Sequence, residues 1–455
     1  MKLLLISDAP ILFENKEKVA YAPYVKEMNM WMKYATSTTY VCPTKYDRSL
    51  LTKAFDFQDC EIKSVKRLEF HTLFSAIISF FSIPYQAVIL WNAMRKADHI
   101  HLRCPGNLAL LAAIVQILFP SKRKTVKYAG NFDPMASQPM AYRWQKSLLS
   151  NTFLTKNIKV LVYGEWPNQT KNIQAFFTAT YSRYQIQPVA NRNWKGPYKA
   201  VFVGTMGANK RPLEVFELIK ELRANGVAIS LDYYGDGPLK KDIEIKVKQA
   251  GLEDHISLHG NVENSIVTKA YKNSHFSLLL SKSEGWPKAV AEAMFWGCIP
   301  VASKVSCVPW MLGYSSSELG VQSYELRDDV SNSKALGSNL EIKDQETYPL
   351  GLGKGFDASS SGSDARSLSK GRERLQNKKN NPSANFAANK EQRGILITDL
   401  SRAVEAVSTY LGHPELLQHM SQAAATWSQQ YTIDDFESEI ALLLKETDPP
   451  KASKK

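Results

Sequence analysis

The chain has 455 residues, of which 44% are hydrophobic and 22% are charged. Single hydrophobic cores seldom grow past roughly 250–300 residues, so this length gives room for two full domains and an appendage. Five cysteines without a Cys-x-x-Cys pair argue against a disulfide framework and a cysteine zinc site, and they are typical of a reduced cytosolic chain.

The excess positive charge lies in the first half of the chain. The net charge is +13, but residues 1–200 hold 27 Lys and Arg against 12 Asp and Glu, a net of +15, whereas the remainder holds 30 against 32. Such an asymmetry favours an anionic surface or substrate on the N-terminal side, either membrane lipid or nucleic acid. A generally basic soluble surface explains the charge equally well.

Short apolar runs alternate with longer helical stretches along most of the chain, which predicts parallel α/β sheets. The opening run is too short for the apolar core of a signal peptide, so we interpret it as the first strand. The strands expected in the first half are Lys2–Ser7, Thr38–Cys42, His99–Arg103, Thr125–Gly130 and Ile158–Tyr163. Those expected in the second half are Ala200–Gly204, Ile229–Gly235, Ile256–Gly260, Phe276–Ser281, Ile299–Ser303 and Gly394–Ile397.

Two apolar stretches of the first half are candidates for membrane contact. Residues 72–90 are divided by Pro84 and residues 108–119 are few, so neither predicts a span, which needs about 20 uninterrupted apolar residues. We expect 108–119 to form a buried helix. For 72–90, a buried helix and an interfacial helix on anionic lipid both remain open, and the basic run 122–124 is a candidate lipid contact.

Polar segments divide the second half. One segment, rich in Pro and Asn, is the expected linker between two domains. A later one, rich in Ser, Gly, Asn and Lys, buries too little apolar surface to offset its ordering entropy and predicts a disordered insertion. The expected organisation is a first domain (1–187), a linker (188–198), a second domain (199–327 and 393–430), the insertion (328–392) and a final helix with a basic tail (431–455). The final helix is expected to begin at the N-cap signal Thr432-Ile433-Asp434-Asp435.

The most informative motif is SKSEGWPKAVAEAMFWG at 281–297, directly after a predicted strand. Gly285 suits a tight turn and Pro287 suits the first helical position. Free N–H groups and the helix dipole at such a helix N-terminus favour a phosphate. Glu284 in the turn and Glu292 about two helical turns later are placed to accept hydrogen bonds from sugar hydroxyls near a bound diphosphate. The alternative is a capped helix whose glutamates face solvent.

Two further turns follow predicted strands. Gly204 and Gly207 allow a ligand close to the backbone, and Lys210 is a candidate to neutralise a diphosphate. Lysine and arginine ahead of an amphipathic helix are, however, more often ordinary surface residues. The turn Gly235-Asp236-Gly237-Pro238 is as consistent with a structural turn as with a ligand loop.

In order and spacing, these motifs resemble the donor-binding domain of the large retaining GT-B glycosyltransferase family four, the glycosyl transferases group 1. The resemblance covers about residues 199–312 and 394–445, and it includes the run Leu258–Val262 and the pair Val308-Pro309. It implies an α/β fold of two doubly wound Rossmann-like domains that face each other across a cleft. It also implies that the C-terminal helix crosses back to the N-terminal domain.

The resemblance further implies roles for single residues. Lys210 and the turn N–H groups would bind the diphosphate of a nucleotide sugar, Glu284 would orient the transferred sugar, and Glu292 would hold the ribose hydroxyls. The backbone of residues 260–262 would read the base. The expected site residues are, for catalysis, Glu284, Lys210 and Arg103, and for donor binding, Gly204, Thr205, Arg211, Gly260, Asn261, Val262, Gly285, Trp286, Pro287, Lys288 and Glu292.

The chain departs from the family pattern at four places, one of which is the insertion at 328–392, foreign to the family's compact domain. Thr205 stands where the family usually has an arginine, so part of the diphosphate charge falls to Lys288 or Arg211. Arg103 stands at the place of a histidine that faces the donor sugar, with His101 two residues earlier. Ala9-Pro10-Ile11 replaces the glycine-rich turn after the first strand.

The motifs therefore predict a glycosyltransferase of the EC 2.4 class that moves a sugar from a nucleotide-diphosphate donor to an acceptor hydroxyl, with retention as the resemblance implies. Charge builds on the leaving phosphate, so the turn N–H groups and Lys210 are the expected main catalytic factors. The sequence has no Asp-x-Asp and no His/carboxylate cluster of metal-ligand spacing, so we expect neither a metal nor another cofactor. The basic first half is expected to bind a saccharide or lipid-linked acceptor at the cytoplasmic face of a membrane, in the assembly of a cell-surface polysaccharide or lipopolysaccharide.

Two alternatives remain open. The first is another GT-B enzyme, such as a nucleotide-sugar epimerase or a phosphorylase. The second is a non-catalytic relative that binds a nucleotide or a polyanion. Nucleic-acid binding has only the net charge in its favour, because no aromatic–basic RNA motif or helix-turn-helix pattern accompanies that charge, and we expect no nucleic-acid partner.

Overall fold

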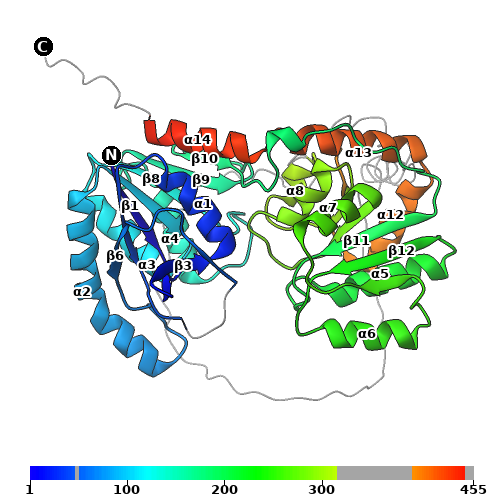
Figure 1. Ribbon diagram of the computed structural model, residues 1–455, viewed down its shortest axis with the longest axis horizontal. Coiled ribbons are helices and arrows are strands. Elements are labelled where there is room, and N and C mark those ends of the chain that lie inside the picture. The colour runs from blue at the N-terminus through cyan, green and yellow to red at the C-terminus, as the bar shows by residue number, and fades with distance from the viewer. Residues whose placement is uncertain (47–50, 315–391, 446–455) are drawn as a thin grey trace, which may run out of the picture. The chain divides into compact units, whose positions relative to one another are not determined.

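The structure, a computed structural model, describes residues 1–46, 51–314 and 392–445 (Figure 1). Over these residues the chain forms a seven-stranded parallel sheet, a six-stranded parallel sheet and a three-stranded antiparallel sheet. The predicted α/β class is thereby confirmed. The predicted insertion at 328–392, apart from Gln392, and the basic tail after Lys445 lie outside the described residues.

The N-terminal sheet has the strand order β10-β9-β8-β7-β1-β4-β6. Its central strand β1 is buried on both faces, because Leu3 and Leu5 join one apolar cluster whereas Leu4 and Ile6 join another. The strands are β1 (Lys2–Ser7), β4 (Ser37–Cys42), β6 (Glu61–Ser64), β7 (His99–Cys104), β8 (Arg123–Tyr128), β9 (Ile158–Tyr163) and β10 (Ile173–Phe176). The helices are α1 (Ala22–Met32), α2 (Leu73–Lys96), α3 (Asn107–Val115), η1 (Gln116–Leu118), α4 (Met140–Ser150) and η2 (Arg183–Gln185).

The C-terminal sheet has the strand order β13-β12-β11-β14-β15-β16. Its strands are β11 (Tyr198–Val203), β12 (Ile229–Tyr234), β13 (Ile256–Leu258), β14 (Phe276–Leu279), β15 (Ile299–Ser303) and β16 (Ile395–Ile397). The helices are α5 (Pro212–Ala224), α6 (Lys240–Gln249), α7 (Asn264–Asn273), α8 (Lys288–Phe295), α9 (Val308–Met311), η3 (Leu400–Arg402), α12 (Ala403–Leu411) and α13 (Pro414–Ser428). β11 already begins at Tyr198, and the predicted domain boundaries around 188–198 stay predictions.

The last helix, α14 (Ile433–Lys445), packs against elements of the N-terminal sheet. Its start is the predicted cap, since the Thr432 hydroxyl accepts a hydrogen bond from the Asp435 N–H at 3.2 Å. The Phe436 ring lies 5.4 Å from that of Phe176 at the end of β10. Tyr34 donates a hydrogen bond to Glu437 at 3.0 Å, and Lys33 forms an ion pair with the same carboxylate. The expected return of the C-terminal helix to the N-terminal domain is confirmed.

Both apolar stretches of the first half form helices that contact the N-terminal sheet. α3 is buried over most of its length, as expected. The prediction that Pro84 divides the other stretch is wrong, because α2 runs through it without a break. Proline removes one backbone hydrogen bond, and Pro84 is exposed within the helix, where water can satisfy the carbonyl that this leaves. By length and composition, α2 would suffice to cross a membrane.

The antiparallel sheet was missed. It comprises β2 (Leu12–Glu14), β3 (Glu17–Tyr21) and β5 (Thr52–Ala54). The β2–β3 turn places both Asn15 and Lys16 at positive φ, 47° and 70°, where hairpins usually carry glycine. The sequence therefore lacks the Asn-Gly or Asp-Gly pair that announces such a turn.

Candidate active site at the switch point of the C-terminal sheet

The order of the C-terminal sheet reverses between β11 and β14, which lie side by side although two strands separate them in the chain. Ligands of open parallel sheets bind beyond the carboxyl ends of the strands at such a switch point. The two loops that begin there are 204–211 after β11 and 280–287 after β14. These loops contain the first and second predicted site motifs.

The two loops are joined directly. The Lys282 N–H donates to the Asn209 carbonyl at 2.8 Å, and the Asn209 side-chain amide donates to the Ser283 carbonyl at 3.0 Å. Lys210 Nζ lies 2.5 Å from Glu284 Oε1, and these side chains retain 27% and 10% exposure. The structure thus brings together the predicted cation and the predicted carboxylate, at a position that a ligand can reach.

The loop after β12 supports the first loop through close backbone contact. The Gly204 N–H donates to the Tyr234 carbonyl and the Met206 N–H to the Asp236 carbonyl, both at 2.9 Å. A Cβ on Gly235 would lie 2.0 Å from the Gly204 oxygen, and one on Gly237 would lie 2.7 Å from the Met206 oxygen. The structure therefore favours the structural reading of the Gly-Asp-Gly-Pro turn.

The second motif leads into α8, which begins at Lys288. Pro287 is the N-cap residue, one position earlier than predicted. The first N–H groups of a helix have no carbonyl partner within the helix, so this end offers hydrogen-bond donors to an anion. Gly285 lies against the N-terminal sheet, because a Cβ at this position would lie 2.4 Å from the Ala129 carbonyl oxygen after β8.

Trp286 belongs to an aromatic group rather than to an open surface. Its side chain is buried, and its ring lies 5.6 Å from Tyr163, 6.4 Å from Trp310 and 6.2 Å from Tyr431. The structure gives the indole a packing function. Trp286 also lines the small cavity that contains Lys288 and Glu292, and its predicted contact with the donor stays a prediction.

Glu292 lies two turns into α8, as expected, with its carboxylate largely enclosed. Thr180 Oγ1 donates a hydrogen bond to Glu292 Oε1 at 2.7 Å. Burial raises the pKa of Glu292, although the bond from Thr180 and the charge of Lys288 lower it. Lys288 is exposed and lines the same small cavity. A carboxylate whose pKa is raised by burial is a good acceptor for hydroxyl groups that enter the cavity.

The residues expected to read the base follow β13. Gly260 has φ of +70°, and its carbonyl accepts a hydrogen bond from the Gly235 N–H at 2.7 Å. Asn261 is exposed, and Val262 packs at the edge of a buried cluster. His259, just before them, stacks on Tyr234 with ring centroids 4.6 Å apart. The loop is therefore fixed through its backbone and leaves Asn261 free to meet a ligand.

Two further residues predicted to bind the donor are Thr205 and Arg211. The Thr205 side chain is exposed and carries no charge. Arg211 Nε lies 3.8 Å from Glu214, and the residue lines a separate cavity of about 310 Å³ that also contains Ser281 and Ser303. The lining of that cavity includes neither Lys210 nor Glu284. Lys288 and Arg211 thus line different cavities, and the expectation that one of them replaces the missing arginine stays a prediction.

Comparisons with known proteins bear on this half of the chain. Residues 185–314 match the family described as glycosyl transferases group 1. This part of the chain is a glycosyltransferase domain. Over 366 residues the chain is also 22% identical to Protein CapJ of Staphylococcus aureus, an alignment that covers 75% of this chain and 87% of CapJ.

Solved structures of similar fold extend over nearly the whole chain. HepE of Anabaena, in complex with UDP and glucose, has a TM-score of 0.55 at 10% identity and covers 98% of this chain and 100% of HepE. A glycosyltransferase of Rickettsia africae has a TM-score of 0.56 at 10% identity and covers 98% of this chain and 99% of its own. Sucrose-phosphate synthase of Thermosynechococcus elongatus has a TM-score of 0.54 at 12% identity and covers 97% of this chain and 98% of its own. These structures confirm the predicted GT-B fold, and the family match of residues 185–314 confirms the prediction of a glycosyltransferase enzyme.

Outside the glycosyltransferase domain, the structure places Arg103 in an internal ion group. Arg103 Nη1 lies 2.6 Å from Glu27 Oε1, and Lys127 Nζ, which is fully buried, lies 3.1 Å from the same oxygen. Burial raises the pKa of Glu27, but the two cations outweigh it and lower this pKa to about 2. Burial lowers the pKa of Lys127 to about 8. Arg103 therefore already has a partner, and its predicted catalytic role stays a prediction.

His101 is a core residue. Its ring lies 3.9 Å from that of Trp31, and its Nδ1 shares a hydrogen bond of 2.9 Å with Thr125. Burial holds the pKa of His101 well below 6.5, so the ring is neutral. This histidine does not substitute for the family's sugar-facing histidine.

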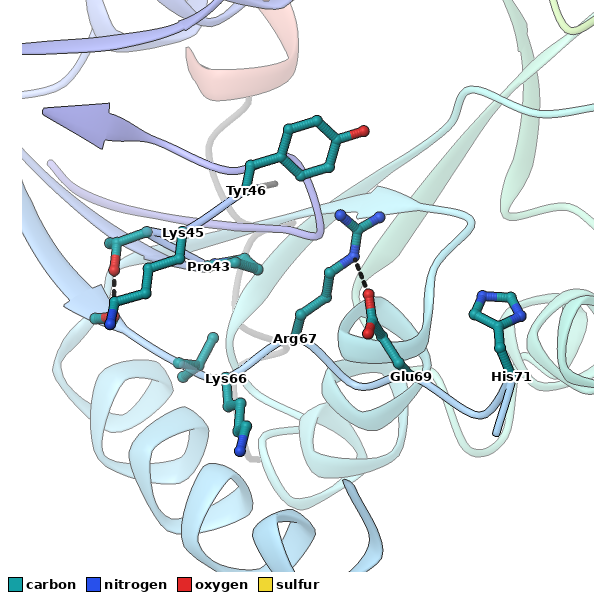
Figure 2. Close-up of a pocket in the computed structure, with 10 residues that line it drawn as sticks. Pro43, Lys45, Tyr46, Lys66, Arg67, Glu69 and His71 are labelled. Carbon is teal, nitrogen blue, oxygen red and sulfur yellow. Dashed lines mark hydrogen bonds and ion pairs between the residues drawn. The ribbon is translucent and has the colours of Figure 1, made fainter. Parts of the chain in front are cut away.

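A cavity of about 600 Å³ opens at the carboxyl ends of β4 and β6, apart from the glycosyltransferase domain (Figure 2). Lys45, Lys66, Arg67 and His71 line it, so its walls are basic. Figure 2 shows Arg67 directed toward Tyr46, whose ring centroid is 5.1 Å from the guanidinium carbon. The guanidinium also lies 3.4 Å from Glu69. The cavity suits an anionic group, and no motif in the sequence indicates it.

Besides this cavity, the sequence analysis missed Asp8. It follows β1 at the switch point of the N-terminal sheet, between β1 and β7. Its carboxylate accepts hydrogen bonds at 3.1 Å from the N–H groups of Leu108 and Ala109 in the first turn of α3. Burial raises the pKa of Asp8, although these bonds lower it. Because the partners are 100 residues apart in the chain, no local pattern announces this cap.

Metal binding gains no candidate from the structure. Within residues 1–46, 51–314 and 392–445, no group of three or more His, Cys, Asp or Glu side chains is placed to hold an ion. All five cysteines fall in these ranges, and each is buried and free. Metal-independent action of the glycosyltransferase domain stays a prediction that needs a direct test.

Proposed function

We propose that the chain transfers a sugar from a nucleoside diphosphate donor, bound at the switch point between β11 and β14, to an acceptor hydroxyl. The observation that carries the proposal is the 2.5 Å pair of Lys210 and Glu284 across the two loops. A cation suits the leaving diphosphate, and a carboxylate suits the hydroxyl groups of the sugar. When the donor enters, each side chain exchanges part of this contact for the ligand.

The reaction breaks the bond between the anomeric carbon and the phosphate oxygen and forms one between that carbon and the acceptor oxygen. Negative charge grows on the diphosphate as its bond to carbon breaks, and the acceptor proton passes to this departing diphosphate or to solvent. Lys210 and the free N–H groups at the start of α8 are fixed before the reaction, so they stabilise this charge without reorganisation. Retention of the anomeric configuration is part of the proposal and rests on the family resemblance.

We propose UDP as the nucleotide. HepE of Anabaena, which shares the fold, was solved with UDP and glucose. Glu292 would accept hydrogen bonds from the ribose hydroxyls in place of the present bond from Thr180. The 260–262 backbone would meet the base, and Lys288 would share the diphosphate charge with Lys210. No metal takes part in this scheme, so excess EDTA is expected to leave the rate unchanged.

The acceptor is proposed to be a saccharide or a lipid-linked saccharide held by the basic N-terminal part, with no nucleic-acid partner. The cavity in Figure 2 supports an anionic acceptor, because its walls carry Lys45, Lys66 and Arg67. We place the reaction at the cytoplasmic face of a membrane, in the assembly of a cell-surface polysaccharide.

The test is the release of UDP from UDP-glucose, UDP-galactose and UDP-N-acetylglucosamine, with and without a bacterial lipid extract as acceptor. One of these donors is expected to give acceptor-dependent release, which Glu284→Gln lowers strongly and the exposed Glu253→Gln leaves unchanged. Isomerised nucleotide sugar without acceptor would indicate an epimerase instead. Release that requires inorganic phosphate would indicate a phosphorylase, and nucleotide binding without turnover of any donor would indicate a non-catalytic relative.

A further inference from the structure

Helix α2 has its polar and apolar faces reversed over its first half. A helix on a sheet normally buries its apolar face and exposes its polar one. In α2, buried Ser79 exchanges two hydrogen bonds with the backbone of Glu69, at 2.8 and 2.9 Å, and buried Gln86 donates to the Lys66 carbonyl at 3.0 Å. The polar residues thus face the protein.

The outward face of α2 is apolar and aromatic. Its large side chains have exposed fractions from 41% to 80% and recur at helical spacing. They are Leu73, Phe74, Ile77, Phe80, Phe81, Tyr85, Val88 and Trp91. No acidic residue occurs in the helix, and its first charged residues are Arg95 and Lys96 in the last turn. Soluble monomers rarely expose a continuous apolar patch of this kind without a partner.

The second half of α2 is fixed to the protein. Leu90, Ala93 and Met94 are buried in the core of the N-terminal sheet, and the helix contacts α3, β1 and β4. Crossing a bilayer would expose this core to solvent or lipid. A helix held in this way contacts a membrane lengthwise, with one face in the lipid.

Basic residues lie beside the middle of α2 and at its last turn. The loop that hydrogen-bonds to Ser79 and Gln86 carries Lys66 and Arg67 into the basic cavity (Figure 2). At the last turn stand Arg95 and Lys96, both exposed. Cations beside an apolar face match the phosphate layer of an anionic membrane, whose surface attracts each such charge by about 1 kcal/mol.

We propose that α2 is the membrane-docking element of this protein, lying in the interfacial layer of an anionic bilayer with its aromatic face in the lipid and the basic cavity over the lipid phosphates. A second copy of the chain is the less suitable occupant, because residues 1–200 carry a net charge of +15 and two such surfaces repel each other. The docking shares the basic cavity with the proposed acceptor, but vesicle binding and sugar transfer are measured separately, so each can fail without the other.

The structure thereby moves the membrane contact away from the basic run 122–124. Lys122 Nζ donates to the Ala97 carbonyl at 2.6 Å, and Lys124 Nζ donates to the Phe119 carbonyl at 2.6 Å and is buried. Arg123 donates to the carbonyls of Leu443 and Leu444 at the end of α14. These three side chains stabilise local structure and are not available to lipid.

The first experiment measures co-sedimentation of the full-length chain with vesicles of phosphatidylglycerol and phosphatidylcholine, and with phosphatidylcholine alone. We expect binding to the anionic vesicles that weakens with salt. The double variant Phe74→Ser/Phe81→Ser should lower the partition coefficient at least about tenfold, because each phenyl ring leaves the lipid. The control Ile245→Ser/Ile266→Ser, which alters exposed apolar residues on α6 and α7, should bind like the wild type.

Charge is tested in the same assay. Lys66→Gln and Arg95→Gln should each lower binding about fivefold, the equivalent of one interfacial charge. The exposed lysines of α6 provide the controls Lys241→Gln and Lys248→Gln, which should have no effect. Equal losses from the two sets would indicate attraction by net charge alone and would overturn α2 as the docking element.

The second experiment locates the contact. All five native cysteines are buried, so Tyr85→Cys introduces an accessible thiol for an environment-sensitive NBD label. Anionic vesicles should shift its emission to the blue, whereas the same label at Ile245→Cys should not respond. A blue shift that grows with protein concentration in the absence of vesicles, with a dimer in light scattering, would identify a second copy as the occupant and overturn the proposal. No response at position 85 would overturn it as well.

Discussion

The two parallel sheets have the same kind of switch point, but they fill it differently. In the N-terminal sheet, Asp8 caps the first turn of α3 and occupies the place where an anion would bind, with hydrogen bonds of 3.1 Å to two N–H groups. In the C-terminal sheet, the corresponding loops hold Lys210 and Glu284 and leave the start of α8 open. A side chain therefore occupies the helix N-terminus in one sheet, whereas in the other no side chain of the described residues caps it and its N–H groups are available to an anion.

The two ion groups differ in the same sense. The group of Glu27, Arg103 and Lys127 is enclosed, with exposed fractions of 9%, 22% and 0%. The pair of Lys210 and Glu284 retains 27% and 10% exposure and, unlike the first group, contains no fully buried cation. We therefore expect changes to the first group to lower stability and changes to the second to lower the rate.

The largest effect is expected from Lys210→Met. Removing one fixed donor from a developing anion typically lowers kcat by about 10²–10³-fold. Sugar transfer should fall by this amount, while the free energy of unfolding in urea changes by less than about 1 kcal/mol, as for partly exposed pairs. Lys220→Met, which breaks an exposed pair on α5, is the matched control and should leave the rate unchanged. A loss of rate that is explained by unfolding of the variant would contradict a role of the Lys210–Glu284 pair in the reaction.

Glu27→Gln should produce the largest change in stability. It leaves two buried cations without their carboxylate, which typically costs about 3–5 kcal/mol. The pKa of Glu27 is about 2 in the fold against an ordinary 4.5, so this stabilisation is present above pH 4.5 and is lost as the pH falls toward 2. Urea unfolding at pH 7 and at pH 3 measures the change, with the exposed Glu439→Gln as control. Equal effects of the two variants at pH 7 would contradict a structural ion group.

Gly285→Ala tests the approach of the C-terminal switch-point loop to the N-terminal sheet. The new Cβ would lie 2.4 Å from the Ala129 oxygen, which requires the backbone to move. Overpacking of this kind typically costs about 1–3 kcal/mol, and the rate should fall because the loop also carries Glu284. Gly412→Ala, whose Cβ would meet its nearest neighbour at 3.8 Å, should be tolerated. If both variants melt at the same temperature, the described contact does not form.

The smallest effect is expected from Asp8→Ala. Loss of a helix cap costs about 1 kcal/mol, and thermal or urea unfolding would detect it. Nucleotide affinity should stay at the wild-type value, since Asp8 belongs to the other switch point. Asp254→Ala, at an exposed loop, serves as the reference. A nucleotide affinity that falls with Asp8→Ala alone would remove the distinction between the two sheets.

Sequence patterns predicted the parts of the fold that depend on local hydrophobicity. Buried strands such as Lys2–Ser7, Ile158–Tyr163 and Ile299–Ser303 were predicted to the residue, because both faces of a parallel strand are apolar. Short edge strands such as β6 and β10, and the antiparallel sheet, have no such run. Their formation depends on pairing partners far away in the chain.

The candidate site divides in the same way. Gly204, Lys210 and Glu284 were predicted because glycine turns after strands have a local signature, and the structure joins them. The packing of Trp286 among three other aromatic rings and the pairing of Arg103 with Glu27 are tertiary contacts. A single sequence cannot show which way such side chains point. The exposure of the apolar face of α2 could not be predicted either, because its apolar composition is compatible with burial in the protein or with contact with lipid.

The central claim is that the C-terminal switch point binds a nucleoside diphosphate. Calorimetric titration of the wild type, Lys210→Met and Lys220→Met with UDP, GDP and ADP tests it most directly. The account predicts that UDP binds the wild type, that Lys210→Met weakens this binding at least about tenfold, equal to 1.4 kcal/mol, and that Lys220→Met leaves it unchanged. Equal affinity of all three proteins for UDP, or no binding of any nucleotide, would contradict it.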